Sequence, residues 1–108
     1  MKPVHWRASA RRDLDDAAAW YAQQGGIALE LRFIAAAEST ALLVREHPKS
    51  GSMRHADEVP DLPARLRFFP VKQFERYLLY YLDLPTRLEV LRVWNSGRGL
   101  AALMEEDA

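Results

Sequence analysis

The sequence predicts a single α+β domain in which a helical hairpin packs on one face of a small, mainly antiparallel sheet. Three observations predict this fold. A short alternating segment opens the chain, two apolar helical patterns flank the pair Gly25-Gly26, and three apolar strand patterns follow one another within residues 65–98. The chain has 108 residues, and typical domains contain roughly 100–150 residues, so we expect one domain over residues 1–108.

Residues 2–7 predict a short strand, with Val4 and Trp6 on one face and His5 on the other. Ser9 follows at the position of a helix N-cap, because a serine hydroxyl accepts hydrogen bonds from the first free amides of a helix. A helix is predicted next, and its apolar stripe consists of Ala10, Leu14, Ala17, Ala18 and Tyr21. We expect its charged residues to face water, namely Arg11, Arg12, Asp13, Asp15 and Asp16.

Gly25-Gly26 is expected to end this helix at about residue 24, because glycine adopts positive φ without strain. A second helix is predicted over residues 27–46, and the short connection makes the two helices a hairpin. Its apolar surface is wide, with Ile27, Leu31, Ile34, Ala35 and Leu42 along one stripe and Leu29, Phe33, Ala36, Ala37 and Leu43 near it. Pro48 and Gly51 are expected to end it, and residues 48–63 predict a loop.

Strands are predicted over residues 65–71, 76–83 and 87–95, and the short links between them make neighbouring strands antiparallel. Both faces of these strands are apolar. Because one helical hairpin covers only one face of a sheet, we expect the other face to be exposed, shielded by the long loop, or covered by another chain. Leu31, Ile34 and Val93 are predicted to lie in the core.

Charge is segregated along the chain, although the formal net charge is zero. Residues 65–98 contain seven basic and three acidic residues, whereas residues 99–108 form an acidic tail with Glu105, Glu106 and Asp107. The resulting positive field is suited to a polyanion or an acidic protein partner. The alternative is that these basic residues only keep a sheet edge soluble.

Several classes of site are excluded. The chain has no cysteine, and His5, His47 and His55 are not spaced to share a metal-binding face. It contains no P-loop, G-x-G-x-x-G or G-x-S-x-G motif, so we expect no cofactor and no catalytic residues. The beginning of the chain lacks the apolar segment of a signal peptide, and no run approaches the ~18 apolar residues of a membrane span, which predicts a cytoplasmic protein.

The end of the last predicted strand concentrates Arg92, Trp94, Asn95 and Arg98. Arginine makes forked contacts with phosphate or carboxylate groups, and tryptophan stacks on a ligand or packs in a core. Two interpretations therefore remain open for this cluster. It binds a partner, or Trp94 belongs to the core while Arg92 pairs with a helix carboxylate.

Short motifs recur in a fixed order along the chain. The first helix opens with S-A-R-R-D-L and contains W-Y near its end, and the second helix is followed by a proline and a glycine. The three strands read L-R-F-F, R-Y-L-L-Y-Y and L-E-V-L-R-V-W-N. An arginine, Arg98, follows shortly after the last strand.

These motifs resemble the ParE branch of the RelE/ParE toxin superfamily of bacterial toxin–antitoxin systems. Asn95 stands where this family commonly has histidine, and Gly99 stands where aspartate often follows the arginine. The resemblance implies a type II toxin that inhibits DNA gyrase by stabilising its cleaved-DNA state. It also implies neutralisation by a cognate ParD-like antitoxin and no bond chemistry by the toxin itself.

The resemblance and the charge pattern together give candidate residues. Those for binding the target are Arg67, Arg92, Trp94, Asn95 and Arg98. Those for binding the antitoxin are Phe69, Arg76, Tyr77 and Tyr81. One alternative is a ribosome-dependent mRNA endonuclease of the RelE kind, with Arg67, Lys72, Arg92 and Arg98 gripping phosphates. No general acid or base follows Arg98, which disfavours cleavage. Another alternative is a module that binds the antitoxin without being toxic.

Overall fold

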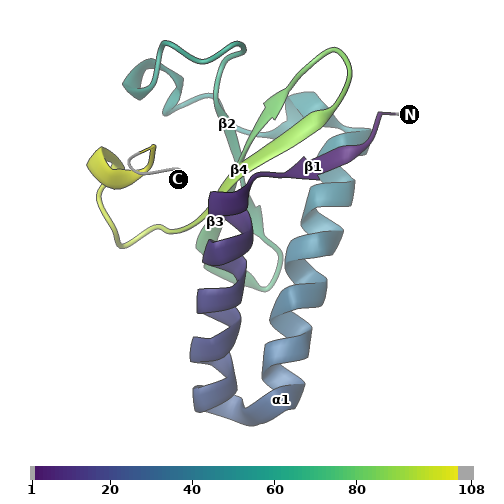
Figure 1. Ribbon diagram of the computed structural model, residues 1–108, viewed down its shortest axis with the longest axis vertical. Coiled ribbons are helices and arrows are strands. Elements are labelled where there is room, and N and C mark those ends of the chain that lie inside the picture. The colour runs from purple at the N-terminus through teal and green to yellow at the C-terminus, as the bar shows by residue number, and fades with distance from the viewer. Residues whose placement is uncertain (1, 105–108) are drawn as a thin grey trace.

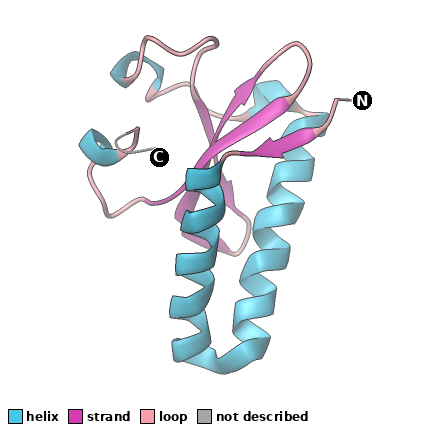
Figure 2. Ribbon diagram, viewed as in Figure 1, coloured by secondary structure: helices cyan, strands magenta, loops and turns pink. Residues whose placement is uncertain are grey.

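A computed structural model describes residues 2–104 and confirms the predicted α+β fold (Figures 1 and 2). The main elements are β1 (Val4–Trp6), α1 (Ala8–Glu46), β2 (Arg67–Val71), β3 (Phe74–Asp83) and β4 (Leu88–Asn95). Short 3₁₀ helices lie at Pro48–Ser50, Ala56–Glu58 and Leu100–Ala102. The sheet has the order β1-β4-β3-β2, in which β2, β3 and β4 form the predicted antiparallel meander and β1 runs parallel to β4.

The predicted helical hairpin is present as two arms of α1 that meet at a sharp bend (Figure 1). The bend lies at Gly25, with φ −143° and ψ 16°, and at Gly26, with φ 77° and ψ −173°. The positive φ of Gly26 is accessible to glycine without strain, which explains why the helix reverses here. The second arm ends at Glu46 as predicted.

The beginning of α1 closes the part of the β4 edge that β1 leaves open. β1 pairs with β4 only as far as Val90. Ser9 is buried, and its Oγ donates a hydrogen bond to the carbonyl oxygen of Leu91 at 3.0 Å. Asp13 Oδ2 accepts one from the backbone amide of Val93 at 3.0 Å. Ser9 was therefore wrongly predicted as an N-cap, since the helix begins before it and its hydroxyl serves the strand edge instead.

The face of the sheet toward α1 holds the first of two cores. Its α1 residues include Ala10, Leu14, Ala17, Ala18, Phe33, Ala37, Ala41 and Val44, which pack against Leu79, Tyr81, Val90 and Val93 of the sheet. The core prediction is confirmed for Val93, and Ile34 packs half-buried against this cluster. It was wrong for Leu31, which is 57% exposed. The second arm turns the row that contains Phe33 and Ala37 toward the sheet, so the stripe of Ile27, Leu31 and Leu42 faces outward.

The opposite face of the sheet is shielded by the long loop, as one of the three alternatives predicted. The second core contains Leu66, Phe68, Tyr80, Leu82, Leu91, Trp94 and Leu103. His55 of the loop stacks on Phe68 at 4.7 Å, and its Nδ1 lies 2.8 Å from the hydroxyl of Tyr80. Burial raises the pKa of Tyr80 to about 12. Leu103 adds cover from the segment after β4, so the alternative of an exposed face is wrong.

A β-bulge in β4 sets the direction of the side chains that follow it. Tyr80 pairs with Arg92 while Tyr81 pairs with Val90, so Leu91 is an extra residue on β4. The alternation between faces is thereby shifted by one residue, a usual effect of bulges. Val93 returns to the core beneath α1, and Trp94 enters the second core.

Candidate binding site

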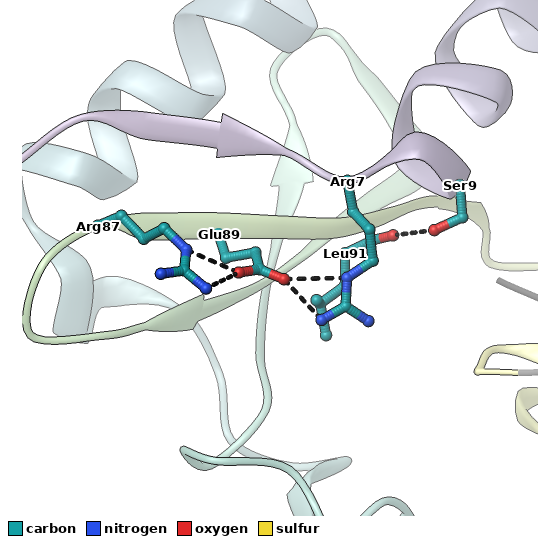
Figure 3. A network of polar contacts seen from close by, with 5 residues as sticks. All are labelled: Arg7, Ser9, Arg87, Glu89 and Leu91. Atoms are coloured by element: carbon teal, nitrogen blue, oxygen red, sulfur yellow. Dashed lines mark hydrogen bonds and ion pairs between the residues drawn. The ribbon is translucent and has the colours of Figure 1, made fainter. Parts of the chain in front are cut away.

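The candidate site lies at the end of β4, and a contrasting arginine cluster lies near its beginning. Figure 3 shows this first cluster, in which the carboxylate of Glu89 is held between two guanidinium groups. Arg7 Nε and Nη2 donate to Glu89 Oε2 at 2.9 and 2.6 Å, and Arg87 Nε donates to Oε1 at 2.9 Å. Burial acts to raise the pKa of Glu89, but the hydrogen bonds and charges of Arg7 and Arg87 outweigh it and lower the pKa.

Arg92 is fixed by α1 rather than presented to solvent. Its Nε and Nη2 donate to the two carboxylate oxygens of Asp13 at 2.7 and 2.8 Å, and its Nη1 donates to the carbonyl oxygen of Leu103 at 2.8 Å. Each side chain of the ion pair is only 12% exposed. Asp13 was therefore wrongly expected to face water. The interpretation that Arg92 pairs with a helix carboxylate is confirmed.

Trp94 forms the base on which Arg98 lies. The indole ring is buried in the second core, with the guanidinium of Arg92 at 4.6 Å from its centroid and that of Arg98 at 4.1 Å. Trp94 thus belongs to the core, as the alternative interpretation predicted. Arg98 remains exposed, and no ion pair joins it to another residue within the described part of the chain.

Asn95 shapes the turn that carries Arg98. Its Oδ1 accepts a hydrogen bond from the backbone amide of Gly97 at 2.8 Å, and its carbonyl oxygen accepts one from the amide of Arg98 at 2.9 Å. Asparagine side chains commonly stabilise turns in this way. The side chain of Asn95 therefore has a structural role in this turn.

A cleft of about 360 Å³ opens between the first arm of α1 and the neighbouring ends of β3 and β4. It is lined by Asp13, Asp16, Ala17, Trp20, Arg76, Tyr77, Val93, Asn95 and Arg98. Four of the predicted site residues, Arg76, Tyr77, Asn95 and Arg98, thus come together here. Charged and polar residues make up about half of its lining, and Trp20 and Tyr77 supply most of its carbon-rich surface. We call this space the apolar hollow, to distinguish it by these two aromatic residues from the space described next.

A second, smaller hollow of about 240 Å³ adjoins the first and is mostly polar. It is lined by Arg12, Asp13, Asp16, Arg92, Trp94, Arg98 and Ala102. Asp13, Asp16 and Arg98 line both spaces, so the two hollows are neighbours, and we refer to them together as the trough around Arg98. We call this second space the polar hollow.

The remaining predicted residues lie elsewhere. Arg67 Nη1 donates to the carbonyl oxygens of Lys49 and Gly51 at 3.2 and 2.9 Å, so this arginine holds the loop. Phe69 is half-buried against the core beneath α1. Tyr81 is fully buried, and its hydroxyl contacts Pro48 and Gly51, which removes it from the surface and corrects its prediction as an antitoxin contact.

Sequence reasoning missed the five lining residues on α1, namely Arg12, Asp13, Asp16, Ala17 and Trp20. Trp20 is 43% exposed, although its neighbour Tyr21 packs on the core. Its position outside the apolar stripe was the available signal, because a large aromatic residue on the solvent side of a helix is unusual. Asp16 and Arg12 gave no such signal, since charged residues are common on an exposed helix face.

The described residues include no group of three or more metal-ligating side chains close enough to share an ion. Over the same part of the chain, no helix has the length and hydropathy needed to cross a membrane.

What the trough offers is exposed guanidinium groups beside aromatic and aliphatic surface, which is suited to binding.

Comparison with known proteins agrees with this geometry. The family described as "ParE toxin of type II toxin-antitoxin system, parDE" matches residues 4–99. A solved structure titled "Chromosomal ParDE TA system from P. aeruginosa" superposes with a TM-score of 0.70 at 16% identity, over 88% of this chain and 96% of that one. A search of curated protein sequences gave no significant match. Since the family match spans nearly the whole chain, this protein belongs to the ParE toxin family of type II toxin–antitoxin systems.

Proposed function

We propose that this ParE-family toxin inhibits DNA gyrase by binding it, without catalysing a bond change, and that a cognate ParD-like antitoxin neutralises it. The family match and the similarity to a structure titled as a ParDE system support the general class. The gyrase target comes from the family resemblance. The choice between a binding inhibitor and a nuclease depends on the composition of the trough.

That composition is the observation that carries the proposal. No histidine lines the trough in the described structure, and the carboxylate of Asp13 is committed to Arg92 by two hydrogen bonds, which leaves Asp16 and Tyr77 as the lining residues able to exchange a proton. General acid–base cleavage needs a group positioned to accept or donate a proton. Arginine guanidinium groups stay protonated, so Arg76 and Arg98 are suited to holding a charged partner rather than to transferring protons.

The structure also limits which predicted residues can meet a partner directly. Asn95 and Arg98, predicted for the target, line the same hollow as Arg76 and Tyr77, predicted for the antitoxin. An antitoxin bound across this hollow covers the target-binding residues. Neutralisation by direct occlusion follows from this shared position.

Two assays with the purified chain test the proposal. We expect inhibition of gyrase supercoiling or accumulation of the cleaved gyrase–DNA complex, and intact mRNA in primer extension on translated transcripts. The Arg98→Ala variant should lose the gyrase effect, while Arg65→Ala, at an exposed arginine outside the trough, should keep it. Cuts at defined codon positions that disappear in Arg98→Ala would establish the nuclease alternative instead.

Antitoxin dependence is tested by co-expression with the gene adjacent to this one. We expect a stable complex and a higher melting temperature than that of the chain alone, because a ligand that binds only the folded state stabilises it. Unchanged melting in the presence of the neighbouring gene product would contradict this part of the proposal.

A further inference from the structure

We propose that the trough around Arg98 recognises an acidic protein segment in which a carboxylate binds Arg98 and an adjacent large apolar side chain enters the apolar hollow. The inference rests on the proposed function, because it specifies the chemistry that a partner of this toxin presents. The partner is defined by its chemistry and not by its identity.

The side chain of Arg98 is held in place at the trough by its contact with Trp94. Its guanidinium lies 4.1 Å from the centroid of the Trp94 ring, and that ring is fixed by burial. The same ring is contacted by Arg92, and the carboxylate of Asp13 holds Arg92 in place through two hydrogen bonds. Stacking engages the flat face of a guanidinium and leaves the N–H groups at its edge available for a forked contact with a carboxylate.

The polar hollow presents hydrogen-bond donors. Arg12 and Arg98 line it together with Trp94, whose buried ring lies beneath the guanidinium of Arg98. A guanidinium group donates hydrogen bonds and accepts none. This hollow therefore favours a ligand that brings hydrogen-bond acceptors.

The charges that line the trough favour a protein segment over a nucleic acid. Arg12, Arg76 and Arg98 line the trough, but the exposed carboxylate of Asp16 lines both of its hollows. A continuous phosphate backbone would pass this carboxylate and be repelled by it. A peptide avoids the repulsion, because its charged and apolar side chains alternate in space.

The apolar hollow has the volume and the aromatic lining to hold a side chain. Its volume of about 360 Å³ lies at the lower end of the roughly 300–1,000 Å³ found for ligand pockets. Trp20, which is 43% exposed, and the half-buried Tyr77 both line it. Aromatic residues at a surface commonly anchor protein partners. The hollow is therefore suited to one large apolar side chain next to the acidic residue.

NMR of the full chain labelled with ¹⁵N tests the inference without any gyrase or toxicity assay, so its failure is distinguishable from failure of the proposed function. The probe is a blocked hexapeptide that alternates aspartate with leucine and phenylalanine. We expect shifts of the indole N–H signals of Trp20 and Trp94 during titration. Trp6, which lines neither hollow, provides the internal control.

Matched probes and variants complete the experiment. The same peptide with asparagine in place of aspartate, and the Arg98→Gln variant, should each bind at least tenfold more weakly, while Arg65→Gln should bind like the unaltered chain. Equal binding of the asparagine peptide, or no shift with the acidic peptide, overturns the inference. Tighter binding of inorganic phosphate or of an oligothymidylate overturns it in favour of a phosphate site.

Discussion

The two ends of β4 each carry a cluster of arginines, yet they are used in opposite ways. Near the beginning of the strand, Arg7 and Arg87 both bind the buried carboxylate of Glu89 (Figure 3). Beyond its end, Arg98 stacks on Trp94 and stays exposed without an ion pair in the described structure. The first cluster satisfies its charges internally, whereas the second leaves a cation facing a hollow.

This difference shows why counting charges does not locate a binding surface. The basic excess of residues 65–98 includes Arg67, Arg87 and Arg92, which hold a loop, a buried glutamate and a helix aspartate, respectively. A guanidinium that is committed to an internal carboxylate adds little to the field that a partner meets. Only the exposed remainder, with Arg76 and Arg98 in the trough, is available for recognition.

Among the charged clusters, the largest effect is expected at the ion pair of Asp13 and Arg92. Asp13→Ala should lower the free energy of unfolding by about 3 kcal/mol, because it leaves the largely buried Arg92 without its carboxylate and removes the acceptor of the Val93 amide. Urea denaturation measures the change. Asp15→Ala, at an exposed neighbouring position, is the control and should be nearly neutral. A loss below about 1 kcal/mol for Asp13→Ala would contradict the structural role of the pair.

The cluster of Arg7, Glu89 and Arg87 should show a smaller effect on stability that depends on pH. Glu89→Gln should cost about 1–2 kcal/mol at neutral pH, because both of its arginine partners retain access to water. The pKa of Glu89 is lowered on folding, so its stabilisation is complete above the usual value of 4.5 and is lost as the pH falls through the lower folded value. Between neutral and acidic pH, the free energy of unfolding should therefore decrease more for the unaltered chain than for Glu89→Gln. Parallel curves would show that the carboxylate is not stabilised by Arg7 and Arg87.

At the end of β4, a change of Arg98 should affect function but not stability. Arg98→Ala should change the free energy of unfolding by less than about 1 kcal/mol, because an exposed charge contributes little, yet it should abolish growth inhibition. Circular dichroism and a growth assay on the same variant check both parts, with Arg65→Ala as the control. If the Arg98→Ala chain is folded and still fully toxic, Arg98 is not part of the functional surface, and neither end of β4 presents an arginine needed for toxicity.

The smallest effect is expected on the outward face of the second arm of α1. Leu31→Gln should alter stability by no more than about 0.5 kcal/mol, because Leu31 is 57% exposed. Phe33→Ala, at a fully buried position on the same arm, should cost about 3–5 kcal/mol. Chemical denaturation of the two variants compares the faces directly. Similar losses for both would mean that Leu31 is covered in solution.

Much of this protein follows from local sequence patterns. The Gly25-Gly26 bend, the end of α1 at Glu46 and the order of the three antiparallel strands all depend on backbone preferences and short-range periodicity. Such preferences act between neighbours in the chain and are visible in the sequence. The motif order also indicated the family that the comparison with known proteins established.

Tertiary structure decided how individual side chains are used. Ser9 has the sequence context of a cap but donates to the edge of β4, and Leu31 has the periodicity of a core residue but lies on the outer face. Nothing in the sequence distinguishes the roles of Arg92 and Arg98. The bulge in β4 and the position of Asp13 on α1 place Arg92 in an ion pair, whereas Arg98 stays exposed on Trp94. Contacts between residues about 80 positions apart depend on how the helix crosses the sheet, which no local pattern of residues determines.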